Sequence, residues 1–388
     1  MREINAIVIA YTMKNYFSLV ICFLAASFSV RSQAIINLSN PLAMERTEEV
    51  ISIPWKEIVT VYPTIDTSNF IVMDKDANQQ VPYQLEHHGS PQIQHLLIQI
   101  SMEANANRVL EVKRGKPAVF PTKTYCRYVP ERDDDFAWEN DKIAFRAYGQ
   151  ALENTIGNAY GLDVWVKRTD KLVIDERYKK GDYHVDHGDG LDYYDVGLTL
   201  GAGDIAPFHD DSIWYSKNYR NWSILDNGPL RSTFELEYDQ WVVGSEKVKV
   251  VKTFSIDAGS QLHKVEASYI FDKSPFIPVA VGIVKRSSSG IELFDEQNGI
   301  MGYWEPADSQ NGTTGVGCVF LQPVKYMMIK EGQLLSVVNA PQGEPVSYYR
   351  GAAWDKAGTI TSAQRWFSYL QTYLQKLNHP VEAVVRKF

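Results

Sequence analysis

Residues 233–238 have the sequence TFELEY and residues 264–271 have the sequence KVEASYIF, and in both stretches apolar and polar residues alternate. A period of two places every second side chain on the same face of a β-strand, so each stretch predicts a strand with one buried and one polar face. The same alternation occurs in residues 142–148 (KIAFRAY) and 162–167 (LDVWVK). Several strands of this kind predict a large, mainly antiparallel β-sandwich.

The chain is predicted to have three parts. Residues 16–30 are apolar, but this stretch of about fifteen residues is shorter than a membrane span of roughly twenty. Residues 1–32 are therefore predicted to be a signal peptide and the mature protein to be secreted or periplasmic, with a lipoprotein anchored at Cys22 as the less favoured alternative. In residues 33–120, short apolar runs separated by turn residues predict a small N-terminal β domain. Residues 121–388 are predicted to form the large sandwich domain.

One helix is predicted near the C-terminus. The apolar residues that recur there at the three-and-four spacing of one helical face are Ala363, Trp366, Phe367, Leu370, Tyr373, Leu374 and Leu377. Thr361 and Gln364 have the spacing of a capping box, and Pro380 ends the pattern. The predicted fold class is therefore mainly β, with a large antiparallel sandwich, a small N-terminal β domain and a C-terminal helix.

Composition limits the classes of function. The 388 residues are 45% hydrophobic and 12% aromatic, which excludes a disordered chain and a coiled coil. A formal net charge of −8 disfavours binding to nucleic acid or to anionic lipid. Cys126 and Cys318, which follow the predicted signal peptide, have no zinc-type spacing and are predicted to be buried thiols rather than a disulfide.

Ionisable residues and glycines concentrate in residues 178–195, YKKGDYHVDHGDGLDYYD. Burying so many ionisable groups is costly unless they are paired or bind a ligand, so this segment is not an ordinary core strand. It is either a functional loop or the hydrophilic tip of a hairpin. As a functional loop it offers His184 or His187 as a base and Tyr193 or Tyr194 as an acid.

The two histidines also fit a metal site, in which His184 and His187 bind a divalent ion together with Asp186 or Asp189. A spacing of three is a weak signal outside a helix, because positions i and i+3 of an extended strand point to opposite faces. Acid–base chemistry without a metal or another cofactor is therefore favoured, and a chelator is expected to change neither activity nor melting temperature. A purely structural role for either histidine is the third alternative.

Arg146 and Tyr148 share one face of the predicted strand at residues 142–148, opposite the face that buries Ile143 and Phe145. That shared face is either exposed to solvent or forms the floor of a groove. A guanidinium can bind a carboxylate through two hydrogen bonds, so an arginine beside aromatic rings suits an acidic sugar.

The other predicted substrate contacts are cations and aromatic rings. A chain with a net charge of −8 needs local cations to hold an anionic substrate. The aromatic side chains of residues 214–222 either stack on sugar rings or belong to the core. The predicted contacts besides Arg146 are Lys179, Lys180, Trp214, Tyr219 and Arg231.

Four motifs resemble, in the same order, those of a known family. They are YVPERDDDFAWENDKIAFRAYG (128–149), GLDVWVKRTDKLVIDERY (161–178), YHVDHGDGLDYYDVG (183–197) and DNGPLRSTFELEY (226–238). The chain resembles a family of secreted bacterial proteins that is named for a domain of unknown function and encoded in polysaccharide-utilisation loci. This resemblance implies the supersandwich fold of galactose mutarotase, which many polysaccharide lyases share.

The resemblance also implies the activity of an oligosaccharide dehydratase of ulvan breakdown. Such a carbon–oxygen lyase removes water across C4 and C5 of a non-reducing-end uronic acid and leaves a 4,5-unsaturated sugar. Removal of the C5 proton requires a base and stabilisation of the charge on the sugar carboxylate. We predict one of the two histidines as the base, Arg146 as the carboxylate ligand, and one of Tyr148, Tyr193 and Tyr194 as the acid. Alanine at His184 or at Arg146 is expected to remove activity and to leave folding intact.

Two other functions remain open. A glycan-binding protein would use the same aromatic rings and Arg146 only to hold the sugar, and a glycoside hydrolase would use a carboxylate pair such as Glu139 and Asp192. With ordinary pKa values of about 6.5 for a histidine base and about 10 for a tyrosine acid, the optimum is expected at about pH 7.5 to 9. A carboxylate pair would favour acid to neutral conditions.

Overall fold

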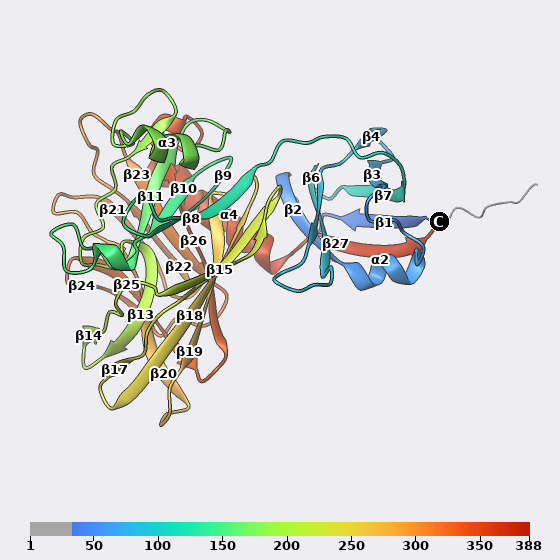
Figure 1. Cartoon of the computed structure of the whole chain (residues 1–388). Helices are drawn as coiled ribbons and strands as arrows, with labels where there is room; N and C mark the ends of the chain where they lie inside the picture. Colours follow the sequence, from blue (N-terminus) through green and yellow to red (C-terminus); the bar gives the residue numbers. More distant parts are fainter. Residues whose placement is uncertain (1–32) are drawn as a thin grey trace, which may run out of the picture.

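The computed structural model describes residues 33–388, so the predicted signal peptide, residues 1–32, lies outside the described chain. Strands make up most of the regular structure and form two domains, a small one at the N-terminus and a large one after it (Figure 1). The predicted fold class is confirmed, including the large antiparallel sandwich, the small N-terminal β domain and the C-terminal helix. No helix within residues 33–388 is both long and apolar enough to cross a membrane.

The small domain consists of two antiparallel sheets and one short helix, α2 (Trp55–Val61). Its strands are β1 Ala34–Ser39, β2 Arg46–Pro54, β3 Phe70–Asp74, β4 Gln79–Gln80, β5 Tyr83–Glu86, β6 His95–Met102, β7 Asn107–Arg114 and β27 Glu382–Lys387. One sheet has the order β27-β1-β7-β3-β4 and the other the order β2-β6-β5. The two sheets and α2 enclose a separate core that includes Ile36, Ile58 and Leu96.

The last strand of the chain belongs to the small domain. β27 pairs with β1 along its whole length, from Lys387 opposite Ala34 to Glu382 opposite Ser39. In Figure 1 this red strand lies beside the blue strand β1. The predicted boundary, which assigned all of residues 121–388 to the large domain, does not hold for this strand. Strand β27 pairs with the edge of a sheet more than 300 residues away, and no local pattern reveals such a pairing.

The large domain contains three antiparallel sheets. The site sheet has β8 Thr124–Val129, β9 Asp135–Asn140, β10 Ala144–Ala147, β11 Leu162–Lys167 and β12 Gly190–Asp192. A second sheet has β13 Ala202–His209, β14 Ser212–Ile213, β20 Phe276–Val284, β24 Tyr326–Lys330 and β25 Gln333–Pro341. The nine-stranded sheet has β15 Asn221–Asn227, β16 Arg231–Glu237, β17 Trp241–Val243, β18 Glu246–Asp257, β19 Leu262–Ile270, β21 Ile291–Asp295, β22 Ile300–Trp304, β23 Thr314–Phe320 and β26 Pro345–Trp354.

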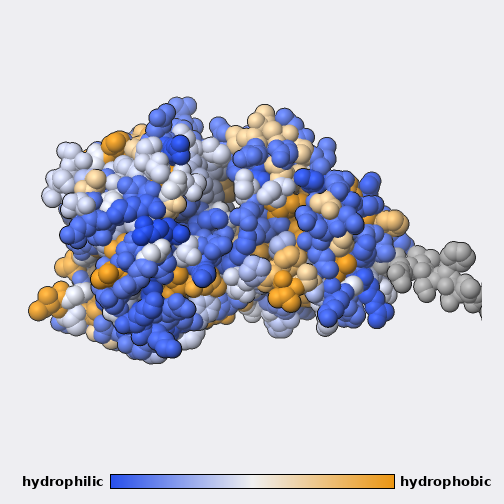
Figure 2. Space-filling model, turned by 90° about the horizontal axis from the view of Figure 1, so that it is seen from above, coloured by the Kyte–Doolittle hydropathy of each residue, from blue (hydrophilic) through white to orange (hydrophobic). Residues whose placement is uncertain are grey.

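The alternating residues of β16 and β19 face the side that the sequence predicts. Phe234 and Leu236 in β16, and Val265 and Tyr269 in β19, are fully buried in the main core. Cys126 and Cys318 are buried there as free thiols, as predicted. The face of the molecule seen in Figure 2 is largely hydrophilic, with hydrophobic residues in scattered groups, in keeping with a chain of net charge −8.

Helix α4 (Ala363–Asn378) covers the outer face of the nine-stranded sheet, where Trp366 and Leu370 are buried. The predicted helix is confirmed, but its N-cap is Ser362 rather than Thr361, because the Ser362 side chain accepts the backbone N–H of Arg365 in the first turn. The helix approaches the sheet closely at Gly317, where a Cβ atom would lie 2.6 Å from Leu370 Cδ1. Glycine is therefore required at this position for the helix to pack.

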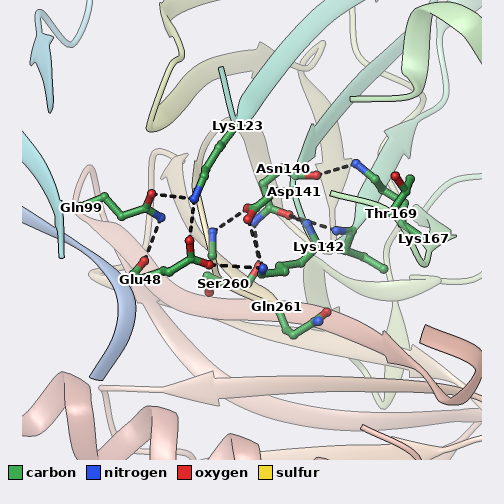
Figure 3. A network of polar contacts seen from close by, with 12 residues as sticks. Glu48, Gln99, Lys123, Asn140, Asp141, Lys142, Lys167, Thr169, Ser260 and Gln261 are labelled. Atoms are coloured by element: carbon green, nitrogen blue, oxygen red, sulfur yellow. Dashed lines mark hydrogen bonds and ion pairs between the residues drawn. The ribbon is translucent and has the colours of Figure 1, made fainter. Parts of the chain in front are cut away.

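A network of polar contacts joins the two domains (Figure 3). Lys123 in the connecting segment donates to Glu48 Oε1 at 2.7 Å and to Gln99 Oε1 at 3.0 Å, both in the small domain. The network continues through the large domain to Lys167, whose Nζ donates to Asn140 O at 2.6 Å. Lys167 belongs to β11, so the domain contact reaches the sheet that carries the candidate site.

Candidate active site

The candidate site is built on one face of the site sheet. Arg146 in β10 lies directly opposite Asp163 in β11, and Asp192 in β12 lies opposite Trp165 of β11. Residues opposite each other share a face, and Trp165 shares a face with Asp163, so all four side chains are on the same side. Helix α3 (Ile174–Lys180) and the loop after it cover this side, and Arg146 is only 3% exposed.

Arg146 is held by aspartates. Its Nη2 donates to Asp163 Oδ2 at 2.5 Å and to Asp192 Oδ2 at 2.9 Å. Its Nη1 lies 3.7 Å from Asp135 Oδ2. The alternative that Arg146 is exposed to solvent is therefore wrong, because α3 and its loop cover this face and three carboxylates surround the guanidinium.

The charges of this cluster balance when one aspartate is protonated. Arg132 joins it, with Nη1 3.3 Å from Asp135 Oδ1. Burial raises the pKa of Asp192 to about 8, and the neighbouring Asp163 carboxylate contributes to this rise while Arg146 opposes it. At neutral pH Asp192 keeps its proton, so two arginines face two carboxylates and one neutral acid, with no net charge.

Asp192 therefore carries a prediction about stability. An aspartate of the unfolded chain loses its proton near pH 4, whereas folded Asp192 keeps its proton to about pH 8. Between these values the folded state binds the additional proton, so this group lowers the free energy of unfolding as the pH rises. Asp192→Asn, which cannot ionise, should flatten the fall of melting temperature across this range. Equal pH slopes for the two proteins in thermal melts would contradict the raised pKa.

His184 stands beside the aspartate cluster, with 63% of its side chain exposed. Its Nδ1 lies 2.9 Å from the backbone oxygen of Asp192 and 3.6 Å from Asp192 Oδ2. A hydrogen bond from Nδ1 to the carbonyl oxygen places the proton on Nδ1 and leaves Nε2 as a free acceptor. His184 thus has the geometry of a general base that a second group holds in position.

A pocket of about 370 Å³ brings most of the predicted catalytic residues together. This volume is within the range of ligand sites. The predicted residues in its lining are Arg146, Tyr148, His184, Tyr193 and Tyr194. The structure therefore assembles residues that are separated in the sequence by up to 48 positions around one space.

Two of the three tyrosines have occupied hydroxyls. Tyr194 donates to the backbone oxygen of Gly201 at 3.2 Å, deep in the core. The Tyr193 hydroxyl lies 2.6 Å from Thr314 Oγ1, and either oxygen can be the donor. These contacts give both tyrosines a structural role.

Of the three tyrosines, Tyr148 is the one whose hydroxyl can donate its proton to a substrate. No acceptor for its hydroxyl hydrogen lies within the part of the chain that the structure describes, and its ring centre is 4.9 Å from the Arg146 guanidinium. Burial and the Asp163 carboxylate raise the pKa of Tyr148 well above its ordinary value, while Arg146 opposes this rise. Tyr148 is therefore protonated at neutral pH, and Arg146 lies where it can stabilise the phenolate.

His187, Lys179 and Lys180 lie outside the lining of this pocket. His187 Nε2 is 3.3 Å from an exposed aspartate, Asp182, and the two lysines are exposed at the end of α3. Within residues 33–388, His184 and His187 do not converge on a common position for a metal ion. Residues 183–189 form turns and bends rather than an extended strand, so the spacing argument does not apply to this segment.

Three of the predicted substrate contacts have other roles. Tyr219 is buried and donates to a backbone oxygen at 2.5 Å, and Trp214 packs against the main core. Arg231 lies where the domains meet, with Nε 2.5 Å from Asp257 Oδ1. Tyr219 belongs to the core and Trp214 packs against it, so the structure supports the core alternative for these two rings.

Glu139, one member of the carboxylate pair considered for a hydrolase, is fully buried. It accepts the Lys167 ammonium at 2.7 Å and the backbone N–H groups of Val173 and Ile174 at 2.7 Å and 2.8 Å. Glu139 therefore anchors the start of α3 and does not line the pocket. The hydrolase interpretation loses one of its two carboxylates.

Three residues of the site, Arg132, Asp135 and Asp163, were not predicted from the sequence. A signal was present for Asp163, because a strand residue with two buried apolar neighbours, Leu162 and Val164, points to the opposite face. Its partner Arg146 is identified only once the register of β10 and β11 is known. For Arg132 and Asp135, the run of charges at residues 131–135 resembles a solvated turn.

A family model described as "Domain of unknown function (DUF4861)" matches residues 38–383. The chain belongs to the DUF4861 family. One relative, the uncharacterized protein P7 of Formosa agariphila, is 28% identical over 386 residues. The match covers 91% of this chain and 93% of that protein. The predicted membership of a family named for a domain of unknown function is confirmed.

Solved structures show the same fold as this DUF4861 chain. A protein in the glycosyl hydrolase family 38 from Enterococcus faecalis superposes with a TM-score of 0.54 at 10% identity, over 92% of this chain and 47% of that one. An alpha-mannosidase from Enterococcus faecalis V583 gives a TM-score of 0.52 at 9% identity, over 92% and 46%. This chain thus spans about half the length of each structure, and the likeness establishes a shared sandwich fold.

Proposed function

We propose that this DUF4861 protein is an exported carbon–oxygen lyase, a dehydratase that removes water across C4 and C5 of a non-reducing-end uronic acid such as those of ulvan oligosaccharides. One observation carries the proposal: His184 and Tyr148 line the same pocket. His184 has a free nitrogen, and Tyr148 has a hydroxyl hydrogen without an acceptor. An elimination requires one group that takes a proton and one that gives a proton.

In the proposed reaction, His184 Nε2 takes the proton from C5 and the electron pair of that bond forms the C4–C5 double bond. The C4–O bond breaks, and the Tyr148 hydroxyl protonates the departing oxygen, which leaves as water. Arg146, 4.9 Å from the Tyr148 ring, stabilises the phenolate. Proton exchange with solvent then returns both residues to their starting states.

The sugar carboxylate must be bound as charge develops on it. The pocket lining contains two possible donors: Arg146, whose Nε and Nη1 have no hydrogen-bond partner within residues 33–388, and Asp192, whose raised pKa favours its protonated form. A neutral carboxylic acid can donate to an anion, as buried acids do in other enzymes. Because the cluster has no net charge at neutral pH, it does not repel an anionic sugar.

Tyr148→Phe should lower the rate of double-bond formation by about 10²- to 10⁴-fold, because it removes the acid and keeps the ring. Tyr194→Phe is the matched control, since the Tyr194 hydroxyl donates to Gly201 O and has no proton to give to a substrate. We expect the control to keep most of the rate and to lose only the stability of one hydrogen bond, about 1 kcal/mol. Equal rates for the two variants would exclude Tyr148 as the acid.

The reaction itself is tested by mass spectrometry of uronate-ended oligosaccharides incubated with the protein. A dehydratase gives products that are lighter by one water, with new ultraviolet absorbance from the unsaturated uronate. A cleaved glycosidic bond would instead indicate a hydrolase or a chain-cleaving lyase. An oligosaccharide that binds in calorimetry and keeps its mass overnight would indicate a glycan-binding protein, and would overturn the proposal.

A further inference from the structure

A second group of side chains lies where the two domains meet. Glu86 ends β5 of the small domain, His88 follows it in the next loop, and Asp226 lies in β15 of the large domain. One ligand-type atom from each residue lies within 4.8 Å of those of the other two. No other group of three or more His, Cys, Asp or Glu residues in the range 33–388 comes this close together.

The backbone of β15 directs the Asp226 side chain towards the loop of the small domain that contains His87 and His88. The pairing of β15 with β16 shifts register between Ile224 and Asp226, and such a bulge redirects a side chain. The Asp226 carboxylate accepts the backbone N–H of His87 at 2.9 Å and that of His88 at 2.5 Å. Asp226 is therefore fixed beside the His88 side chain by the small domain itself.

Two side chains hold the Glu86 carboxylate in position. It is 3% exposed and accepts Arg231 Nη1 at 3.0 Å and His95 Nδ1 at 2.7 Å. Partners of this kind orient the carboxylate ligands of metal ions. Among residues 33–388 the exposed imidazole of His88 has no hydrogen-bond partner, and it is free to turn.

The charges favour a divalent cation. Arg231 is bound by Asp257 through two hydrogen bonds, of 2.5 Å and 2.8 Å, besides its contact with Glu86. Glu86 and Asp257 thus both bind Arg231, and Asp226 lies beside Glu86. These three carboxylates and one arginine have a net charge of −2. One divalent ion would neutralise it.

We propose that Glu86, His88 and Asp226 bind a zinc-type divalent metal ion that fastens the small domain to the large one. One imidazole nitrogen and two carboxylate oxygens form a donor set that suits Zn²⁺. Zinc bonds of about 2.0 to 2.2 Å require the three atoms to move together, and rotation of the exposed His88 side chain permits this. Two of the three proposed ligands, Glu86 and His88, also line a pocket of about 400 Å³, together with Tyr349.

The test titrates the chelator-treated, purified protein with Zn²⁺ and measures bound metal and melting temperature. We expect one zinc per chain and a higher melting temperature, because an ion that binds only the folded state stabilises it. This differs from the sequence-based expectation that a chelator leaves the melting temperature unchanged, which concerned a metal at His184 and His187. His88→Asn should lower the affinity at least about 100-fold and abolish the rise in melting temperature. Asparagine is chosen because His88 has a φ of 51°, which asparagine tolerates better than alanine.

His87→Asn is the matched control. His87 is the neighbouring residue, but its Nδ1 contacts Ser90 O at 3.2 Å and its ring is not part of the group. We expect this variant to bind zinc like the unchanged protein. Absence of zinc binding, or an equal loss in His87→Asn and His88→Asn, would overturn the proposal, and so would Ca²⁺ competing as well as Zn²⁺. None of these measurements depends on the proposed dehydratase activity.

Discussion

Replacing His184 by alanine should lower the rate of unsaturated-uronate formation by about 10²- to 10⁴-fold, the usual contribution of a general base. The structure gives His184 a free Nε2 in the pocket and one hydrogen bond, from Nδ1 to the Asp192 carbonyl oxygen. Because 63% of the side chain is exposed, its removal should cost only about 1 kcal/mol of stability. Initial rates from ultraviolet absorbance and a thermal melt measure the two effects separately.

His187→Ala is the control for this experiment, because it removes an exposed histidine from the same loop without touching the pocket. We expect His187→Ala to retain the rate of the unchanged protein. If His184→Ala stays within tenfold of the unchanged rate, His184 is not the base. If the two variants lose activity equally, the loop and not the imidazole of His184 is responsible.

Arg146→Ala should act on folding as strongly as on activity. The substitution leaves Asp163 and Asp192 buried without the guanidinium that now binds them at 2.5 Å and 2.9 Å. Removing one partner of a buried ion pair costs about 3 to 5 kcal/mol. The sequence-based expectation that this variant folds normally is therefore corrected by the burial of Arg146, and denaturant unfolding should show the loss directly.

Arg168→Ala provides the comparison for Arg146→Ala. Arg168 pairs with Asp186 where both side chains are partly exposed, at 32% and 21%. Exposed pairs contribute about 0 to 1 kcal/mol, so the midpoint of unfolding should hardly move. A loss below about 1 kcal/mol for Arg146→Ala as well would show that the aspartates do not depend on the buried guanidinium.

Strand alternation and helical spacing were enough to predict the fold class. The periods of two and of three to four are properties of the local chain, and burial of one face follows from them wherever a partner layer exists. TFELEY at residues 233–238 therefore predicted β16, and the spacing of Trp366 and Leu370 predicted α4. The pairing of β27 with β1 was not predictable in this way, because it depends on where a distant strand leaves an edge open.

For the site, the sequence by itself determined which chemistry is present: an imidazole at His184, a phenol at Tyr148 and a guanidinium at Arg146. Only the tertiary structure decided that Arg146 is engaged by Asp163 and Asp192, which lie 17 and 46 positions away. The physical reason is that charge pairing and burial depend on strand register and on the layer that α3 places over the sheet. Neither is encoded in the neighbours of Arg146, whereas the alternation that positions its side chain is.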